Sequence, residues 1–279
     1  MSLSERITYA TVLIKCKYKN GLSGSGTGFI IDLCVNAQKQ QCIPVIVTNS
    51  HVIEGASKVT FEFCKGTPDG NPIDQEVFTV NCDIDNGGGW IHHPDPNIDL
   101  VCFRLGPILN FLHDKHVKIY FTHLGTDIIP TEETAHNLMA MEEIVMVGYP
   151  DGISDNYNHK PILRRGITAT HYKNNYQGKM EFMVDMACFP GSSGSPIFIL
   201  NEGAYATKQG LSFGTRILFL GVLYGGPQHL ATGQLVFANI PNTAKPLIQM
   251  PNNLGVAIKA AKILDFEPVL LQMEQGGTT

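Results

Sequence analysis

The sequence of 279 residues predicts an all-β protein in which the strands close into a barrel. Short apolar runs of strand length recur along the chain, and glycine, proline and asparagine separate them. Helical periodicity is scarce. Hydrophobic residues make up 43% of the chain and charged residues only 16%, which is typical of a globular protein with a packed core.

The first half of the chain contains five predicted strands, each an apolar or an alternating run. They span residues 7–19, 24–32, 43–48, 59–63 and 77–80. The second strand starts from a glycine-rich turn. The third delivers His51 at its end, and Ser50 is predicted to be the N-cap of a short helical turn.

The second half begins less regularly. Residues 106–141 carry no sustained pattern, although 117–121 looks extended and 132–141 looks helical, and we place the passage between two barrels here. The strands predicted after this passage cover residues 144–149, 162–170, 180–185, 197–200, 217–224 and 234–240. Residues 254–264 have apolar side chains at roughly helical spacing, so the C-terminal tail is predicted to be helical.

The net charge of -5 gives no electrostatic reason to expect a nucleic acid or an anionic membrane as a partner. Lys15, Lys17 and Lys19 alternate with apolar residues, which is the pattern of the solvent face of a half-buried strand. No apolar stretch is long enough to span a bilayer, and the N-terminus lacks the apolar segment of a signal peptide. The sequence therefore predicts a cytoplasmic protein, unless a leader has been removed.

The chain has seven cysteines, an odd number without a Cys-x-x-Cys pair, which favours reduced thiols over a disulfide framework. Cys16, Cys102 and Cys188 lie within apolar strand patterns and are predicted to pack in the core. Cys34 and Cys42 flank a hairpin loop and are the one pair whose spacing suits a disulfide.

The sequence predicts neither a metal nor a cofactor. No set of cysteines and histidines has the spacing of zinc ligands. The glycine-rich stretch 24–28 lacks the lysine of a phosphate-binding loop. An α/β-hydrolase elbow would need glycine at position 195 and a histidine after the acid, so that class of enzyme fits poorly.

A serine stands between glycines in the stretch Phe189-Pro190-Gly191-Ser192-Ser193-Gly194-Ser195-Pro196, which lies between two apolar runs. A serine hydroxyl is a poor nucleophile at neutral pH, so attack requires a nearby base and a bent backbone that brings main-chain N–H groups together. The flanking glycines permit such a bend, yet the same residues also suit an ordinary turn between strands.

Two other stretches favour the catalytic interpretation. His51 closely follows the β-branched run 45–48, and Asp99 opens the apolar run 100–105. Base, acid and nucleophile then occur in the order His, Asp, Ser, which is the order of one well-known serine peptidase triad.

The rival residues fit less well. His92 and His93 are nearer to Asp99 in the sequence but lack the Thr-Asn-Ser-His-Val context of His51. Asp95 belongs to the turn pair Asp95-Pro96, whereas a carboxylate at the start of a buried strand is held rigidly and is shielded from water.

With these motifs the sequence resembles the chymotrypsin-fold serine peptidases, and among them the HtrA/Deg-type and related trypsin-like peptidase domains. The matching pieces occur in the family's order at residues 24–31, 47–53, 98–101, 148–150, 185–196 and 236–241. The last piece resembles the final strand of the catalytic domain. The family usually has glycine where this chain has Ser195.

The resemblance implies two six-stranded antiparallel β-barrels followed by a short helical tail. Residues 1–120 would form the barrel that carries the histidine and the aspartate, and residues 121–250 the barrel that carries the serine and the oxyanion hole. Residues 251–279 would form the tail, which is too short for the PDZ domain of HtrA proteins.

The resemblance also implies a serine endopeptidase that cleaves protein or peptide substrates through an acyl-enzyme. Ser193 would be the nucleophile, because Ser192 and Ser195 occupy variable positions of the motif. His51 would be the general base and Asp99 would orient it, while the N–H groups of Gly191 and Ser193 would form the oxyanion hole. The alternative is a catalytically silent binding or scaffolding module, against which the intact triad argues.

By the same resemblance, one set of residues would line the primary substrate pocket. They are Ala187, Cys188, Phe189, Tyr224, Gly225, Gly226 and Ala238. None of them is acidic, and Asp185 lies before the pocket, so a preference for Lys or Arg has no counter-charge. We expect small or medium apolar residues on the acyl side of the scissile bond, the P1 position.

Overall fold

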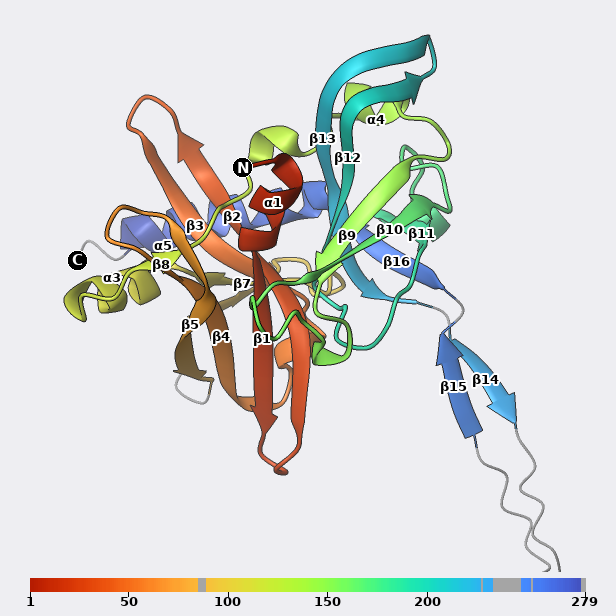
Figure 1. Ribbon diagram of the computed structural model, residues 1–279. Helices are drawn as coiled ribbons and strands as arrows, with labels where there is room; N and C mark the ends of the chain where they lie inside the picture. Colours follow the sequence, from red (N-terminus) through yellow and green to blue (C-terminus); the bar gives the residue numbers. More distant parts are fainter. Residues whose placement is uncertain (85–88, 227, 233–246, 252, 277–279) are drawn as a thin grey trace, which may run out of the picture.

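The computed structural model describes the chain apart from residues 85–88, 227, 233–246, 252 and 277–279. The described strands form two large antiparallel sheets that lie side by side (Figure 1). A separate two-stranded ribbon pairs β14 (Gln228–Thr232) with β15 (Leu247–Pro251). The all-β class predicted from the sequence is therefore confirmed.

The first sheet comprises eight described strands. They are β1 (Thr11–Tyr18), β2 (Ser23–Asn36), β3 (Gln41–Thr48), β4 (Ala56–Gly66), β5 (Pro72–Asp83), β6 (Trp90–His92), β7 (Val101–Arg104) and β8 (Ile119–Tyr120). Their order is β5-β4-β1-β2-β3-β7-β6, and β8 pairs with β4. The resemblance implied six strands here, and the eight include β6 and β8, which contain only three and two residues.

The second sheet is a closed barrel of six strands in the order β10-β11-β16-β13-β12-β9. They are β9 (Glu143–Gly148), β10 (Ile162–Thr168), β11 (Glu181–Asp185), β12 (Pro196–Thr207), β13 (Gly210–Gly225) and β16 (Leu254–Lys259). The hairpin of β12 and β13 is longer than predicted and projects beyond the barrel (Figure 1).

Short helices connect the described strands. They are α1 (Leu3–Tyr9), α2 (Ser50–Ile53), α3 (Gly106–Asp114), η1 (Thr126–Ile128), α4 (Glu132–Asn137), η2 (Pro150–Gly152), η3 (Tyr176–Gly178), η4 (Ala260–Asp265) and α5 (Phe266–Gly276). No helix within the described ranges is long and apolar enough to cross a lipid bilayer.

Helix α1 replaces the start of the strand predicted at residues 7–19. Ser2 and Glu5 form a capping box, in which the Ser2 hydroxyl accepts from the Glu5 amide and the Glu5 carboxylate accepts from the Ser2 amide. This local pairing satisfies the free N–H groups of a helix and favours helix over strand. Ile7 is consequently buried between the two sheets instead of within β1.

The C-terminal segment also differs from the prediction. Residues 254–259, predicted to be helical, form strand β16, which pairs with β11 on one side and β13 on the other. A strand that is buried on both faces is a continuous apolar run, which periodicity cannot distinguish from a helix. The strand lies beyond the boundary predicted at residue 250, and helix begins only at Ala260. The piece 236–241, predicted as the final strand, lies outside the described residues.

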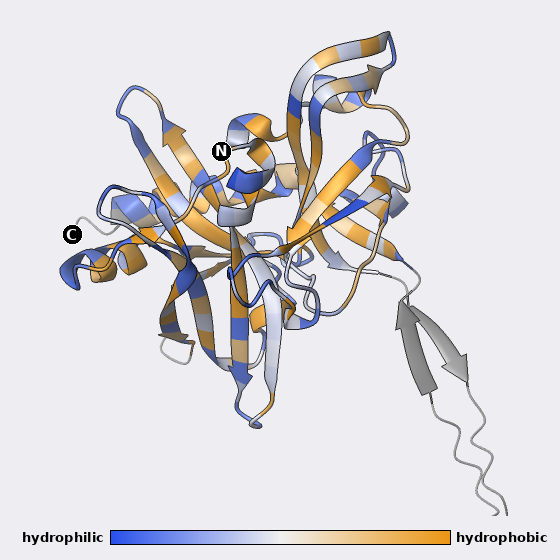
Figure 2. Cartoon of the chain, in the orientation of Figure 1, coloured by the Kyte–Doolittle hydropathy of each residue, from blue (hydrophilic) through white to orange (hydrophobic). Residues whose placement is uncertain are grey.

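Three apolar clusters hold the molecule together, one inside each sheet and one between the sheets. In the seam, Phe29 of β2 packs edge-on against Phe219 of β13, with ring centroids 5.1 Å apart, and Phe198 of β12 packs beside it. In Figure 2 the strands of both sheets carry many hydrophobic residues, and the loops at their ends are mainly hydrophilic. The seam therefore fixes the two sheets against each other.

All seven cysteines are free thiols. Cys16 and Cys102 are buried as predicted, and Cys188 is half-buried. Cys34 and Cys42, the one pair considered for a disulfide, are not bonded to each other. The Cys34 amide instead donates to Glu267 Oε1 at 2.8 Å, which ties the end of β2 to helix α5.

Candidate active site

The first sheet brings the predicted histidine and aspartate together where β3 and β7 run side by side. Asn49 is the N-cap residue of α2, so the assignment of Ser50 to that position was wrong. Asn49 Nδ2 donates to the Asp99 carbonyl at 2.8 Å, and the Ser50 hydroxyl donates to the Leu100 carbonyl at 3.0 Å. These bonds fix the start of α2 against the start of β7.

His51 and Asp99 are joined at two points. The His51 amide donates to Asp99 Oδ1 at 3.0 Å, and His51 Nδ1 lies 2.5 Å from Asp99 Oδ2. Because an ionised carboxylate only accepts hydrogen bonds, Nδ1 carries the proton. The other ring nitrogen, Nε2, has no partner among the described residues and is the basic atom of this tautomer.

The rival residues are engaged elsewhere. His93 is buried, and its ring nitrogens lie 3.0 Å from the Asp95 amide and 3.0 Å from the Lys262 carbonyl. Asp95 accepts from the amide of Asn97 in a local turn. His92 is exposed at the end of β6. None of them contacts Asp99 through a side-chain bond in the described part of the chain.

The serine stretch is a tight loop between β11 and β12. Gly191 and Gly194 have φ values of +79° and +84°, a region that side chains disfavour. A Cβ atom on Gly194 would lie 1.9 Å from the Thr27 carbonyl oxygen. Glycine is therefore required at position 194 by both conformation and space.

The three serines of this loop differ in exposure. Ser192 and Ser195 are fully buried, and the Ser195 hydroxyl has no partner among the described residues. Ser193 is partly exposed. Of the three serines in this loop, Ser193 is therefore the one that solvent can reach.

The main-chain amides of the loop fall into two groups. The amides of Ser192, Gly194 and Ser195 donate to the carbonyls of Phe189, Leu223 and Ser192. In the described part of the chain, the amides of Gly191 and Ser193 donate to nothing. These two free donors are the pair predicted for the oxyanion hole.

Thr27 of β2 connects the serine loop to the histidine strand. Its amide donates to the Ser193 carbonyl at 2.9 Å, and its own carbonyl accepts from the Thr48 hydroxyl at 2.7 Å. Its hydroxyl donates to the Gly191 carbonyl at 3.2 Å and accepts from the Tyr149 amide at 3.0 Å. Thr27 thus links the first sheet to the second barrel at the candidate site.

Thr27 had no predicted role, although it lies within residues 24–31, which match the family. The available signal was a lone hydroxyl among glycines in a predicted buried strand, because buried hydroxyls require hydrogen-bond partners. A second residue was also missed: Arg164 of β10 donates to the Ala187 carbonyl and to the Ser192 hydroxyl.

No hydrogen bond joins the Ser193 hydroxyl to His51 within the described residues. Such bonds are often long in peptidases without substrate and shorten when a substrate binds. The structure therefore joins base to acid, and it holds the serine loop to the same strand system through Thr27.

The predicted pocket residues lie on two segments of the second barrel. Ala187, Cys188 and Phe189 follow β11, and Tyr224 and Gly225 end β13. Cys188 packs near Gly255 of β16, since a Cβ atom there would lie 2.6 Å from the Cys188 sulfur. Gly226 is exposed, and Ala238 lies outside the described residues.

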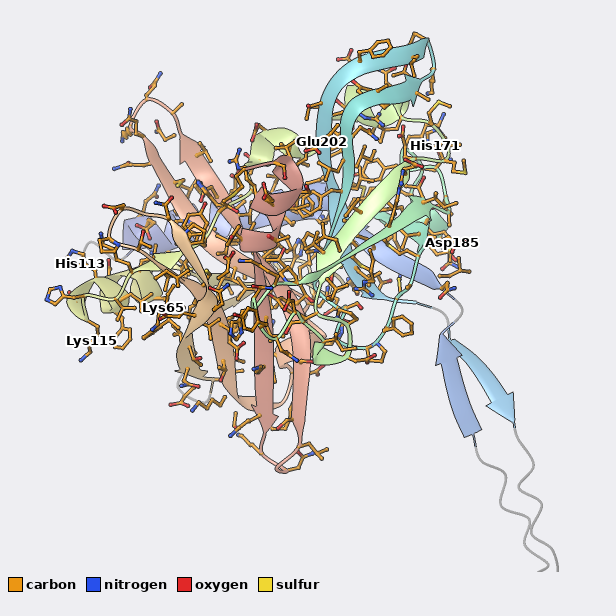
Figure 3. All side chains as sticks on the ribbon, viewed as in Figure 1. Lys65, His113, Lys115, His171, Asp185 and Glu202 are labelled. Carbon is orange, nitrogen blue, oxygen red and sulfur yellow. The ribbon has the colours of Figure 1, made fainter. Side chains whose placement is uncertain are left out.

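Cys188, in the predicted pocket wall, carries no negative charge at neutral pH, because burial raises the pKa of its thiol to about 11. Asp185 is exposed and lies at the outer edge of the second barrel (Figure 3). The Tyr224 hydroxyl is held protonated at neutral pH, because burial and the nearby Glu181 raise its pKa to about 12.

A family model described as the trypsin-like peptidase domain matches residues 26–205, which include all three predicted catalytic residues. The chain belongs to the trypsin-like peptidase domain family. The peptidase is accordingly a serine endopeptidase of the chymotrypsin fold, as the sequence motifs predicted. No curated protein sequence matches it.

Solved structures similar to the peptidase include three proteases of low sequence identity. The active form of a protease from M. tuberculosis is 13% identical, with a TM-score of 0.45 over 93% of this chain and 80% of that one. The HtrA-type protease AlgW with a tripeptide is 15% identical, with a TM-score of 0.46. The MamO protease domain from Magnetospirillum magneticum is 13% identical, with a TM-score of 0.44 over 94% of this chain and 97% of that one. The peptidase is covered over 96% of its length by the AlgW match and spans 60% of AlgW.

Proposed function

We propose that the peptidase cleaves peptide bonds with Ser193 as nucleophile, His51 as general base and Asp99 as the residue that orients the imidazole. The observation that carries this proposal is the two-point contact between His51 and Asp99. It fixes both the ring and its tautomer, so that the unprotonated Nε2 is available to accept a proton.

In the acylation step, Ser193 Oγ forms a bond to the carbonyl carbon of the substrate while His51 Nε2 takes the hydroxyl proton. The positive charge that develops on the imidazole is balanced by Asp99. The carbon–nitrogen bond then breaks, and His51 returns the proton to the leaving amine. A water molecule attacks the acyl-enzyme in the same manner and releases the acid.

The free amides of Gly191 and Ser193 would bind the oxygen that becomes negative during both attacks. Donors of this kind act because they are positioned before charge develops, and the loss of one costs about 3 kcal/mol in the barrier. The buried bonds to Thr27 and Leu223 supply the required rigidity on the side of the loop away from the substrate.

We further propose that small or medium apolar residues are preferred at P1. The side chains that flank the serine loop on this side are Ala187 and Cys188, and neither is charged at neutral pH. A peptide library should show cleavage after residues such as Ala, Val or Leu. A profile dominated by Lys or Arg would contradict the preference.

Covalent labelling with a fluorophosphonate probe tests the catalytic assignment. The wild-type peptidase should be labelled, and Ser193→Ala should abolish labelling. Ser195→Ala is the matched control, because it removes a neighbouring hydroxyl that is buried and makes no hydrogen bond among the described residues. Labelling that persists in Ser193→Ala would disprove the assignment.

The alternative function is a binding or scaffolding module that retains the trypsin fold without catalysis. The observation in its favour is that no hydrogen bond joins Ser193 to His51 in the described residues. Absence of labelling in the presence and absence of peptides would favour this module over the enzyme.

A further inference from the structure

Arg164 lies on strand β10, behind the serine loop. Its Nη1 donates to the Ala187 carbonyl at 2.5 Å, and its Nη2 donates to the Ser192 hydroxyl at 2.9 Å. The neighbouring Arg165 is exposed and pairs with Glu143. The alternation of a strand thus sends one arginine inward and the next one outward.

The Arg164 side chain is partly buried, and its positive charge has few partners. Its Nε atom is buried and has no hydrogen-bond partner among the described residues. No carboxylate of the described chain lies within ion-pair distance of it, and Asp151 interacts with it only as a nearby charge. Burial lowers its pKa, although an arginine stays charged at neutral pH.

Partial burial of a charge without an ion pair costs stability, so the two hydrogen bonds of Arg164 indicate what the residue does. Both go to the segment that begins at Ala187 and ends at Ser192, and they clamp its two ends with one planar group. Ser192 stands directly between Gly191 and Ser193, whose amides are the free ones. The Ser192 side chain is fully buried, and Arg164 is its one hydrogen-bond partner in the described residues.

We propose that Arg164 is a positioning residue that holds segment 187–192 in the conformation that leaves the Gly191 and Ser193 amides free for the substrate oxygen. The inference rests on the proposed function, since it assigns a support to the proposed oxyanion hole. Gly191 has a φ of +79°, a region that glycine adopts as readily as the ordinary one. Its own backbone therefore does not select a single loop conformation, and contacts at the ends of the segment do. The planar guanidinium presents its N–H donors in a fixed geometry and can bond two acceptors at once. The donors of a lysine ammonium rotate and do not fix two acceptors in this way.

The test compares Arg164→Met, which keeps the length of the side chain but not its donors, with Arg165→Met as the control on the same strand. Steady-state kinetics on a peptide ester should show kcat lowered about 10- to 100-fold in Arg164→Met. This is less than the roughly 10²- to 10³-fold loss when an oxyanion donor is removed, because the variant keeps both amides and loses only their support. KM should change little, because Tyr224 and Gly225 of the predicted pocket lie on β13, outside the segment that Arg164 holds. Arg165→Met should behave as wild type.

A peptide aldehyde inhibitor gives a readout that depends on the oxyanion hole, because its adduct carries the same oxyanion. Arg164→Met should weaken aldehyde binding by the same factor as it lowers kcat. Ethylguanidinium added to Arg164→Ala should restore part of the activity, since it can occupy the vacated space and supply the missing donors. Equal kcat values in Arg164→Met and Arg165→Met would overturn the proposal.

Two further measurements test the role of Arg164. If Arg164→Met does not fold, Arg164→Lys keeps the charge but not the fork, and its kcat should still fall severalfold at unchanged KM. Hydrogen exchange does not depend on activity: residues 187–193 should exchange faster in the Arg164 variant than in the Arg165 variant. Equal exchange in this segment would overturn the positioning role, whereas failure of the wild type to label would instead refute the proposed function.

Discussion

Replacement of Thr27 by valine tests what the hydrogen bonds of its hydroxyl contribute, because the packing of the side chain is kept. Thr27 is fully buried, and valine has nearly the same shape, so no cavity forms. The change removes two hydrogen bonds of the hydroxyl, to the Gly191 carbonyl and from the Tyr149 amide. Tyr149 is only 5% exposed, so its amide cannot turn to water.

The expected loss in the free energy of unfolding follows from these contacts. A buried amide that loses its acceptor costs about 1–3 kcal/mol, and the second hydrogen bond contributes about 1 kcal/mol. We therefore expect Thr27→Val to lower the free energy of unfolding by about 2–4 kcal/mol. Thr27→Ser keeps the hydroxyl and loses one methyl group, which costs about 1 kcal/mol.

Urea unfolding measures the stability, and the rate of fluorophosphonate labelling measures the effect on the serine loop. Thr27→Val should be less stable than Thr27→Ser and should be labelled more slowly, because the Gly191 carbonyl is no longer held. A valine variant that is as stable as wild type, or more stable than the serine variant, would refute the reasoning.

Three other changes give distinct outcomes. Asp99→Asn should lower kcat by about 10⁴ in a peptide ester assay, because the amide favours the wrong imidazole tautomer. Gly194→Ala should lower the free energy of unfolding in urea by about 3 kcal/mol or more, since its Cβ atom would collide with backbone. Burial raises the pKa of the Cys102 thiol from 9.0 to about 12, so between these values the unfolded chain loses a proton that the folded chain keeps. Stability should fall there by about 1 kcal/mol per pH unit, and Cys102→Ala should lack this part of the slope.

The substitutions of Asp99 and Gly194 each have a matched control. Asp95→Asn should retain wild-type kcat, because Asp95 serves a local turn. Gly21→Ala should cost only about 1–2 kcal/mol, since Gly21 has φ +83° but no atom within 4 Å of the added Cβ. Asp95→Asn as slow as Asp99→Asn, Gly21→Ala as unstable as Gly194→Ala, or an unchanged alkaline slope in Cys102→Ala would contradict the respective argument.

Features that depend only on neighbouring residues could be recognised in the sequence. The glycines around Ser193 are required by conformation at their own positions, so they stand out without knowledge of distant contacts. His51 and Asp99 lie beside strand runs whose apolar pattern marks them. The sequence located β9, β10 and β11 within two residues, and it located one end each of β12 and β13, whose hairpin extends further than predicted. It missed β16, which has no period to distinguish it from a helix.

The hydrogen-bond partners around the serine loop depend on contacts between segments that are distant in the sequence. The roles of Thr27 and Arg164 depend on which carbonyl and hydroxyl groups lie within hydrogen-bond distance in the folded protein. No local sequence pattern predicts these partners. The pairing of Cys34 with Glu267 instead of Cys42 has the same origin. Sequence alone therefore determined the fold class and the candidate catalytic residues, because backbone conformation and strand patterning are local. Tertiary structure decided which groups hold the serine loop, because hydrogen bonds join whichever polar atoms the packed barrels bring together.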